Sequence, residues 1–331
     1  MPARRNSLLR RCAPLVAVVP FVAACTRSAP PVAVGTASRD AIVEPETTEA
    51  KERPRLPHDV VMRAALPFYG LRFEDGAQLS PEGLAEELAD ADAICIGESH
   101  DNPHHHYAQL ALLQQLLRLG RAGGRELAVG FEMVQLPFQG ALDDWSEGKI
   151  DDEEFLEATH WESRWGYDFN LYRLLFESAR RDGATLLALN ARRELTQKIA
   201  RQGLRGLSDD ERNELPVLDF NSEEHRSFFR AAMSKHPMPH AGHRRMYAAQ
   251  LTWDETMAAV SARWLRKRMP ARQIIVIAGS GHCHHSAIPM RIKRRTGARV
   301  VSVKPILVRG DQDPCPELAG YDFGVLLQAD P

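Results

Sequence analysis

The chain has 331 residues, of which 44% are hydrophobic and 26% charged, so it can bury one large core or two smaller ones. Its 42 Lys and Arg residues against 44 Asp and Glu residues give a net charge of −2, which excludes the basic footprint of a nucleic-acid-binding protein. Five cysteines in a chain of this length exclude a disulfide-built scaffold.

The first 24 residues have the pattern of a secretion signal. A basic segment precedes the apolar run Ala13–Ala24, which is too short to span a membrane. The run ends in Val22-Ala23-Ala24-Cys25, which resembles the bacterial lipobox, where small residues precede a cysteine that is lipidated after cleavage. Residues 1–24 are therefore predicted to be a lipoprotein signal peptide, with Cys25 as the lipidation site. A plain signal peptide cut near Ala24 is the alternative.

The segment after the signal is predicted to be a tether. Residues 25–57 are rich in Ala, Pro, Thr and Glu and have no sustained apolar period, so we expect them to be disordered. A lipid on Cys25 would hold the protein to a membrane of the bacterial cell envelope. Thr26, where an aspartate would signal retention, favours the outer membrane.

Strands and helices alternate from residue 58 to residue 328. Asp75-Gly76 marks a hairpin turn, and a helix is predicted at Pro81–Leu88. Apolar runs typical of buried strands occur at Ala93–Ile96, Leu127–Met133, Thr185–Leu189, Ile274–Ala278 and Val300–Val303, and Phe323–Leu327 could add an edge strand. Helical patterns at His104–Leu119, Leu171–Arg181 and Cys283–Arg295 separate most of these runs.

The stretch between Leu189 and Ile274 has helical patterning and no clear strand. Its candidate helices lie at Arg193–Gln202, Asp209–Leu215, Ser222–Met233 and Arg244–Lys267. We therefore predict an α/β fold, in which a mostly parallel sheet is flanked by helices and carries an inserted all-helical subdomain at residues 192–245.

Polar residues occur where four predicted strands end, and ligands bind beyond the carboxyl ends of strands in open parallel sheets. Glu98 and His100 follow the first strand, Glu132 lies in the second, Asn190 ends the third, and His282 follows the fourth. Carboxylates and imidazoles are the usual materials of acid–base and metal sites. The buried Glu132 carboxylate must meet a cation, a proton or a donor, and a structural arginine is the alternative to a site role.

The residues after His100 have structural interpretations as well. Asp101-Asn102-Pro103 can start a helix, with Asp101 or Asn102 as its cap. His104, His105 and His106 occupy the first turn and cannot all face one way, so each singly is predicted to be solvated. His104 is the best site candidate of the three, and His105 and His106 are predicted to be bystanders.

The residues after Gly279-Ser280-Gly281 and the cysteines are predicted to have structural roles. Cys283, His284 and His285 are predicted to begin a helix, and Cys95 is predicted to be a packed thiol in a buried strand. Outside the signal the chain has three cysteines, which allow at most one bridge.

The segment Met233–Tyr247 is rich in histidine and methionine. Thioether, imidazole and phenolate groups are all haem or copper ligands, which makes His240, His243 and Tyr247 candidates for haem. A Pro-containing connector that happens to be His-rich is the alternative.

Gln250 and Asp254 share one face of the next predicted helix, which either points at the sheet edge or is a solvated stripe. The aromatic residues Trp161, Trp165, Tyr167, Phe169 and Tyr172 favour core over a haem wall.

Taken together, these segments resemble the ChaN haem-binding lipoproteins. The resemblance is carried by Gly97–Asn102, Gly130–Met133, Ala188–Asn190, Gln250–Ala258 and Ala278–His282, and it extends from about Pro67 to Leu327. It implies an outer-membrane lipoprotein that serves haem or iron acquisition, pairs with a second copy around haem, and could work with an outer-membrane haem receptor. It also implies a tyrosine ligand for haem, for which Tyr247 is our candidate.

The same family belongs to a wider group that includes the Tiki metalloproteases and erythromycin esterases. In that group, glutamate and histidine at the positions of Glu98, His100, Glu132 and His282 carry metal-dependent or acid–base hydrolysis. Two functions are therefore predicted from the sequence. The first is haem binding, and the alternative is a hydrolase that uses these four residues, alone or with a divalent metal.

Overall fold

The computed structural model describes residues 55–235, 239–266, 271–310 and 312–329. The predicted signal peptide, Cys25 and nearly all of the predicted tether lie outside these residues. The chain from Leu56 onward belongs to one compact unit. Among the described residues, no helix combines the length and the apolarity that crossing a membrane requires.

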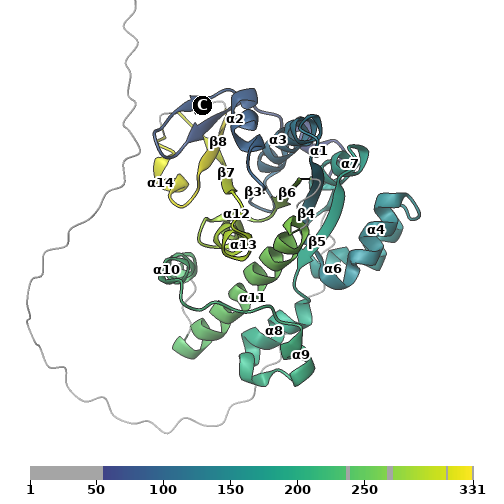
Figure 1. Cartoon of the computed structure of the whole chain (residues 1–331), viewed down its shortest axis with the longest axis vertical. Coiled ribbons are helices and arrows are strands. Elements are labelled where there is room, and N and C mark those ends of the chain that lie inside the picture. The colour runs from purple at the N-terminus through teal and green to yellow at the C-terminus, as the bar shows by residue number, and fades with distance from the viewer. Residues whose placement is uncertain (1–54, 236–238, 267–270, 311, 330–331) are drawn as a thin grey trace, which may run out of the picture. The chain divides into compact units, whose positions relative to one another are not determined.

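Eight strands form one sheet in the order β2-β1-β8-β7-β3-β6-β4-β5 (Figure 1). Pairing is parallel from β8 to β5, and β1 and β2 add an antiparallel hairpin at one edge. The strands are β1 Phe68–Arg72, β2 Gln78–Leu79, β3 Ala93–Ile96, β4 Glu126–Gln135, β5 Thr185–Asn190, β6 Arg272–Ile277, β7 Val300–Val308 and β8 Phe323–Gln328. The apolar runs correctly predicted where all six parallel strands lie along the chain, but Phe323–Leu327 is not the edge strand that the sequence suggested, because β8 lies between β1 and β7.

Helices cover both faces of the sheet, as the continuous apolar character of its central strands requires. On one face, Ile94 and Ile96 of β3 pack in a core with leucines of α3 (Pro103–Ala122) and α7 (Arg173–Arg181). On the other face, Ala93 and Cys95 pack with α11 (His240–Leu265) and α13 (Ile288–Thr296). Figure 1 shows α11 and α13 side by side against the strands.

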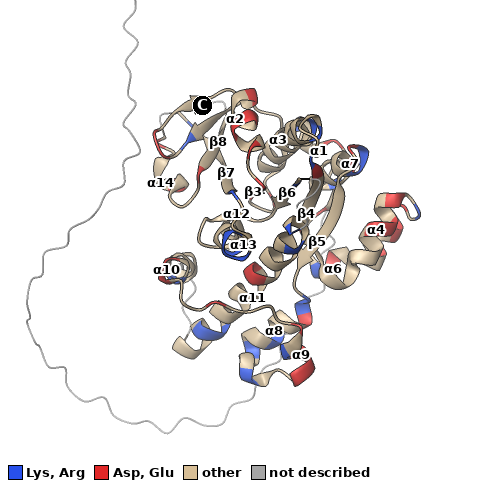
Figure 2. Ribbon diagram, in the orientation of Figure 1, with Lys and Arg blue, Asp and Glu red and all other residues tan. Residues whose placement is uncertain are grey.

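Only helices lie between β5 and β6 in the described part of that stretch. They are α8 Arg193–Gln202, α9 Asp209–Asn213, α10 Glu223–Ala232 and α11, with short 3₁₀ turns at Leu204–Gly206 and Met233–Lys235. The long helix α11 packs against both α8 and α13 and so returns the chain to the sheet. Lys and Arg are interspersed with Asp and Glu on α8 and α9 (Figure 2). The α/β fold with a helical insertion is confirmed.

The remaining helices surround this framework. They are α1 Val60–Arg63, α2 Pro81–Ala89, α4 Gln139–Glu147, α5 Asp152–Ala158, α6 Trp161–Arg164, α12 Ser280–Cys283 and α14 Cys315–Leu318. The aromatic cluster before α7 is largely core, because Trp161, Phe169 and Tyr172 are all buried. Trp165 and Tyr167 are only half-buried and border the site described below.

Two further structural predictions are wrong. The single helix predicted at Cys283–Arg295 is broken into α12 and α13, because Pro289 lacks a backbone N–H and favours the first turn of a new helix. Cys95 is not a packed thiol. It forms a disulfide with Cys283, with Cα atoms 5.3 Å apart, because β3 and β6 are neighbours and α12 follows β6.

Candidate functional site

The predicted polar residues meet at one edge of the sheet. Strands β3, β6, β4 and β5 are adjacent in this order, so their carboxyl ends lie together. Glu98 and His100 follow β3, Glu132 lies in β4, and His282 lies in α12 directly after β6. We call this group the sheet-edge site. Asn190 ends β5, but its Oδ1 atom is buried without a hydrogen-bond partner in the part of the chain that the structure describes.

Glu98 and His100 form the first half of the site. The Glu98 side chain is buried, and its Oε1 atom lies 2.6 Å from Nδ1 of His100, whose side chain is 30% exposed. Burial opposes the charged form of His100, but the hydrogen bond to Glu98 and the charges of Glu132 and Glu98 outweigh burial and raise the pKa of His100. The His100 ring packs beside the rings of Trp165 and Tyr167.

Glycine allows the two loops of the site to touch. A Cβ atom on Gly279 would lie 2.8 Å from Cε1 of His100, and a Cβ atom on Gly97 would lie 2.9 Å from the Cα atom of Ser280. Neither approach leaves room for a side chain. The loop after β3 and the loop after β6 therefore pack backbone to backbone, which brings His100 next to Glu132.

His282 lies between two buried carboxylates and forms the second half of the site. Its Nδ1 atom is 2.6 Å from Oδ1 of Asp254, and its Nε2 atom is 3.3 Å from Oε1 of Glu132. The Gly279 N–H donates to Oε2 of Glu132 at 2.7 Å. Asp254 comes from α11, whose polar face therefore points at the sheet edge, with Gln250 beside Asp254 at 3.4 Å.

These contacts define the charges of the second half. Burial penalises the charged form of His282, but Glu132 and Asp254 raise its pKa well above the usual value. Burial also opposes the Glu132 charge, yet His282, His100 and the Gly279 amide lower the pKa of Glu132 to about 2. The pKa of Asp254 is lowered in the same way, with His282 and His225 as its main partners. The result is an imidazolium between two carboxylates.

The interpretation of His105 and His106 as solvated bystanders is wrong, because both are buried. His105 accepts the Ser99 N–H at 3.1 Å, and burial lowers its pKa to about 4. His106 lies 3.4 Å from Oε2 of Glu98. His104 instead bonds the Ala64 carbonyl, at 2.8 Å. The sequence feature that could have indicated the burial of His106 is its helical spacing with the apolar residues Leu110, Leu113 and Leu117.

Sequence reasoning also missed His225 in α10. Its side chain is 1% exposed, and Nε2 lies 2.9 Å from Oδ2 of Asp254. Only the helical spacing of His225 and the apolar Phe229 could have indicated burial. Spacing along one helix does not reveal a contact with a residue 29 positions away in another helix.

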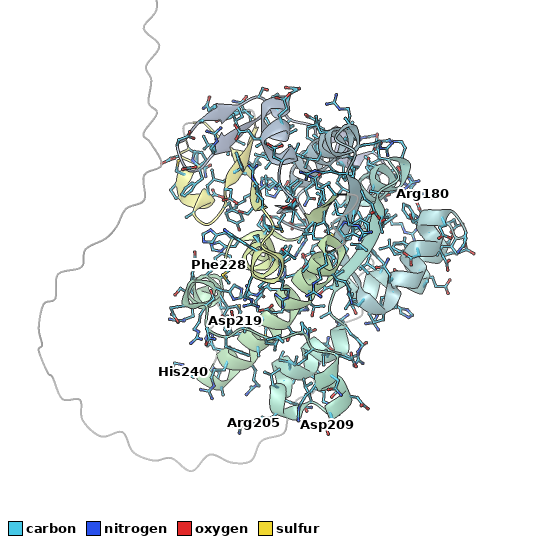
Figure 3. All side chains as sticks on the ribbon, viewed as in Figure 1. Arg180, Arg205, Asp209, Asp219, Phe228 and His240 are labelled. Carbon is cyan, nitrogen blue, oxygen red and sulfur yellow. A yellow bond between two sulfur atoms is a disulfide. The ribbon has the colours of Figure 1, made fainter. Side chains whose placement is uncertain are left out.

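The haem candidates form a stripe along the first turns of α11. His240 is exposed at the N-terminal end of the helix (Figure 3), His243 is half-buried, and Tyr247 is 7% exposed. The Tyr247 hydroxyl lies 3.2 Å from Nδ1 of His225, and burial raises the pKa of Tyr247. These residues do not join the sheet-edge site directly. They connect to it through His225 and Asp254.

The predicted divalent-metal site finds no support. The described residues contain no group of three or more His, Cys, Asp or Glu side chains arranged to hold a metal ion. Both nitrogens of His282 face carboxylates, whereas His100 has only its Nδ1 atom bonded to a carboxylate, that of Glu98. The arrangement can hold and relay protons, and the half-exposed His100 is its most accessible member.

Comparison with solved structures shows the same fold in ChaN of Campylobacter jejuni, described for its cofacial haem binding. The two chains share 21% identity with a TM-score of 0.62, over 79% of this chain and 97% of that one. An erythromycin esterase mutant in its open conformation matches with 11% identity over 82% of each chain, at a TM-score of 0.42.

Sequence comparison gives one curated relative and one family. The chloroplastic protein RETICULATA-RELATED 5 of Arabidopsis thaliana is 22% identical over 226 residues, which are 63% of this chain and only 30% of that protein. Residues 84–292 match the family described as haem-binding uptake, Tiki superfamily, ChaN. Because this match spans more than half of the chain and includes the whole sheet-edge site, the protein belongs to the ChaN haem-binding uptake family.

Proposed function

We propose that this protein binds haem and acts in haem or iron uptake. The observation that carries the proposal is the family match, which covers residues 84–292 and so includes the sheet-edge site, α10 and α11. The Campylobacter jejuni protein of the same fold is described as binding haem. In this role haem is cargo, which the protein takes up and passes on.

The N-terminal end of α11, which begins at His240, offers better ligands for haem than the sheet-edge site does. His240 and His243 lie three positions apart on one helix face, and His240 is exposed. Imidazole is a common axial ligand of haem iron. The nitrogens of His282, in contrast, are both turned to carboxylates. Tyr247 would reach the iron only after its hydrogen bond to His225 opens. We therefore assign the contact with haem to His240 and His243.

A haemin titration tests this assignment. The full chain should give a saturable, shifted Soret band, and His240→Ala with His243→Ala should weaken binding by about tenfold or more, since one lost ligand bond is worth at least about 1.4 kcal/mol. His160→Asn is a matched control, because His160 is an exposed histidine in a left-handed conformation that Asn tolerates. Absence of a saturable band in the unmodified chain would rule out haem binding.

We further propose that a lipid on Cys25 anchors the protein in the bacterial cell envelope, at the outer membrane. The signal pattern supports export, and so does the Cys95–Cys283 disulfide, because structural disulfides belong to oxidising compartments. Cys25→Ala should move the protein from the membrane fraction to the soluble fraction of the envelope. A second copy of this chain and an outer-membrane haem receptor are the partners to seek by cross-linking in the lipidated protein.

A second candidate function is acid–base hydrolysis at the sheet edge, favoured by the convergence of two imidazoles on one carboxylate. Glu132, with a pKa of about 2, is a weak base at neutral pH. His100 is the better acid–base group, because it is half-exposed and oriented by Glu98. Ester and peptide substrates should be turned over by the unmodified chain and not by His100→Ala. Equal turnover by both would remove this function.

A further inference from the structure

A buried histidine lies beside each of the two carboxylates that contact His100 and His282. In the first row, His100 Nδ1 contacts Oε1 of Glu98 at 2.6 Å, and His106 Nε2 lies 3.4 Å from Oε2 of the same carboxylate. In the second row, His282 Nδ1 contacts Oδ1 of Asp254 at 2.6 Å, and His225 Nε2 lies 2.9 Å from Oδ2. Asp254 is therefore held between two histidines, whereas Oε2 of Glu98 has no hydrogen-bond partner among the described residues, so His106 only lies beside that carboxylate.

We infer that His225 is a positioning residue of the sheet-edge site, which fixes the Asp254 carboxylate that orients His282. The inference goes beyond haem binding and does not depend on it. His225 is almost completely buried, at 1% exposed, so it acts through Asp254 and cannot itself touch a ligand in this conformation.

The neighbours of His225 select one tautomer of its imidazole, in which Nε2 carries the proton. Tyr247 Oη lies 3.2 Å and an Arg291 guanidinium nitrogen 3.3 Å from Nδ1 of His225. A guanidinium group can only donate, so Nδ1 carries the lone pair and Nε2 carries the proton. The Nε2–H group is then aimed at Asp254. This histidine is thereby held by Tyr247 of α11 and Arg291 of α13.

Arg291 is itself fixed, which makes the second row rigid. The residue is fully buried, donates to the Ala287 carbonyl at 2.9 Å, and lies 3.1 Å from Oε1 of Glu255. A second contact fixes helix α10, because its residue Phe228 (labelled in Figure 3) stacks on His284 with ring centroids 4.1 Å apart. The position of His225 therefore depends on three helices and the loop after α12.

His106 is fixed by the end of β3. Gln109 donates to the carbonyls of Ile96 and Gly97 at 3.1 and 3.2 Å, so its Oε1 atom is turned to Nδ1 of His106 at 3.2 Å. The imidazole also packs edge-on against Tyr172, whose hydroxyl donates to the His100 carbonyl at 3.1 Å. His106 lies 3.4 Å from Oε2 of Glu98 without a hydrogen bond, whereas His225 lies 2.9 Å from Oδ2 of Asp254, so only the second row anchors its carboxylate.

Imidazole NMR of the full chain, titrated with pH, tests the inference. His225→Phe keeps a ring of similar volume but removes the N–H, so Asp254 loses an anchor and the midpoint of His282 should fall by about one pH unit or more. His225→Gln keeps an N–H donor on a flexible side chain and should restore at least half of that shift. The midpoint of His100 should stay within a few tenths of a unit in both variants.

The first row supplies the control. His106 forms no hydrogen bond with Glu98, so His106→Phe should leave the midpoint of His282 unchanged. If His225→Phe fails to fold, Tyr247→Phe, which removes only one donor to His225, should shift His282 in the same direction by a smaller amount. The inference is overturned if His282 does not respond to the His225 and Tyr247 variants, or if these variants shift His100 and His282 equally, because equal shifts indicate general loosening of the fold.

Discussion

Glu98 has one oxygen bonded to His100, whereas its Oε2 atom is buried without a hydrogen-bond partner among the described residues. The polar groups near Oε2 include His106 Nε2, which also faces the His100 carbonyl at 3.2 Å. An ionised carboxylate can only accept, and an unsatisfied buried acceptor is costly. At the residue scale, the site thus has a defined weak point at one oxygen atom.

The first prediction follows from that atom. Glu98→Gln retains an oxygen for the N–H of His100 and supplies N–H groups where Oε2 stood, so the variant should be within about 1 kcal/mol of the unmodified chain. Glu98→Ala removes both interactions and leaves a cavity, and should lose about 2–4 kcal/mol. Urea unfolding at neutral pH measures both. A glutamine variant as unstable as the alanine variant would show that the negative charge is required.

His105 gives the second prediction, a pH dependence of stability. Burial lowers its pKa to about 4 in the folded chain, against about 6.5 in the unfolded chain, so the unfolded state binds more protons between these values. The contribution of His105 is present in full above pH 6.5 and is lost as the pH falls toward 4. This loss should be on the order of 2–3 kcal/mol.

His105→Gln checks this sign, since glutamine does not titrate. Its free energy of unfolding should fall less than that of the unmodified chain between pH 6.5 and pH 4, and His160→Asn should leave the slope unchanged, because His160 is exposed. Parallel pH profiles for the unmodified chain and His105→Gln would contradict the assignment. His284, whose pKa burial also lowers to about 4, will add to the remaining slope.

At the scale of elements, the third prediction concerns the loops after β3 and β6. Gly279→Ala should displace His100, because the added Cβ atom would lie 2.8 Å from its Cε1 atom. We expect a loss of about 1–3 kcal/mol, typical of overpacking, and a changed titration midpoint for His100 by NMR. Gly140→Ala is the control, since nothing lies within 4 Å of a Cβ atom there and a helical alanine should be neutral or stabilising. An unchanged His100 midpoint in Gly279→Ala would refute the close approach.

The elements themselves show how far sequence reasoning reaches. Continuous apolar runs located β3 to β8, because buried parallel strands need apolar residues on both faces. The same rule placed Glu98, Glu132 and His282 at one edge. It could not supply His225, because that contact depends on how α10 packs after a loop, nor α4 to α6, whose short patterns have no clear period. His106 was missed because its imidazole was weighed as a polar surface group.

Cys95–Cys283 is a covalent link between two distant parts of the chain. The two cysteines are 188 residues apart, and the bond closes a loop that contains β4, β5, the helical insertion and β6. It also ties the two halves of the sheet-edge site together, since Cys95 precedes Glu98 by three positions and Cys283 follows His282 directly. The disulfide could therefore affect both the stability of the fold and the geometry of the site.

The fourth prediction separates these two effects. A bond that closes so long a loop restricts the unfolded chain strongly, so Cys95→Ala combined with Cys283→Ala should lower the free energy of unfolding by about 2–5 kcal/mol. Calorimetry and urea unfolding measure this loss, and a loss below about 0.5 kcal/mol would contradict it.

The pairing of β3 with β6 should persist without the disulfide, because backbone hydrogen bonds and packed side chains hold both strands. The titration midpoints of His100 and His282 should therefore change little in the double variant, since their carboxylate partners come from other contacts. A large shift of both midpoints would instead show that the disulfide itself sets the distance between the two halves of the site.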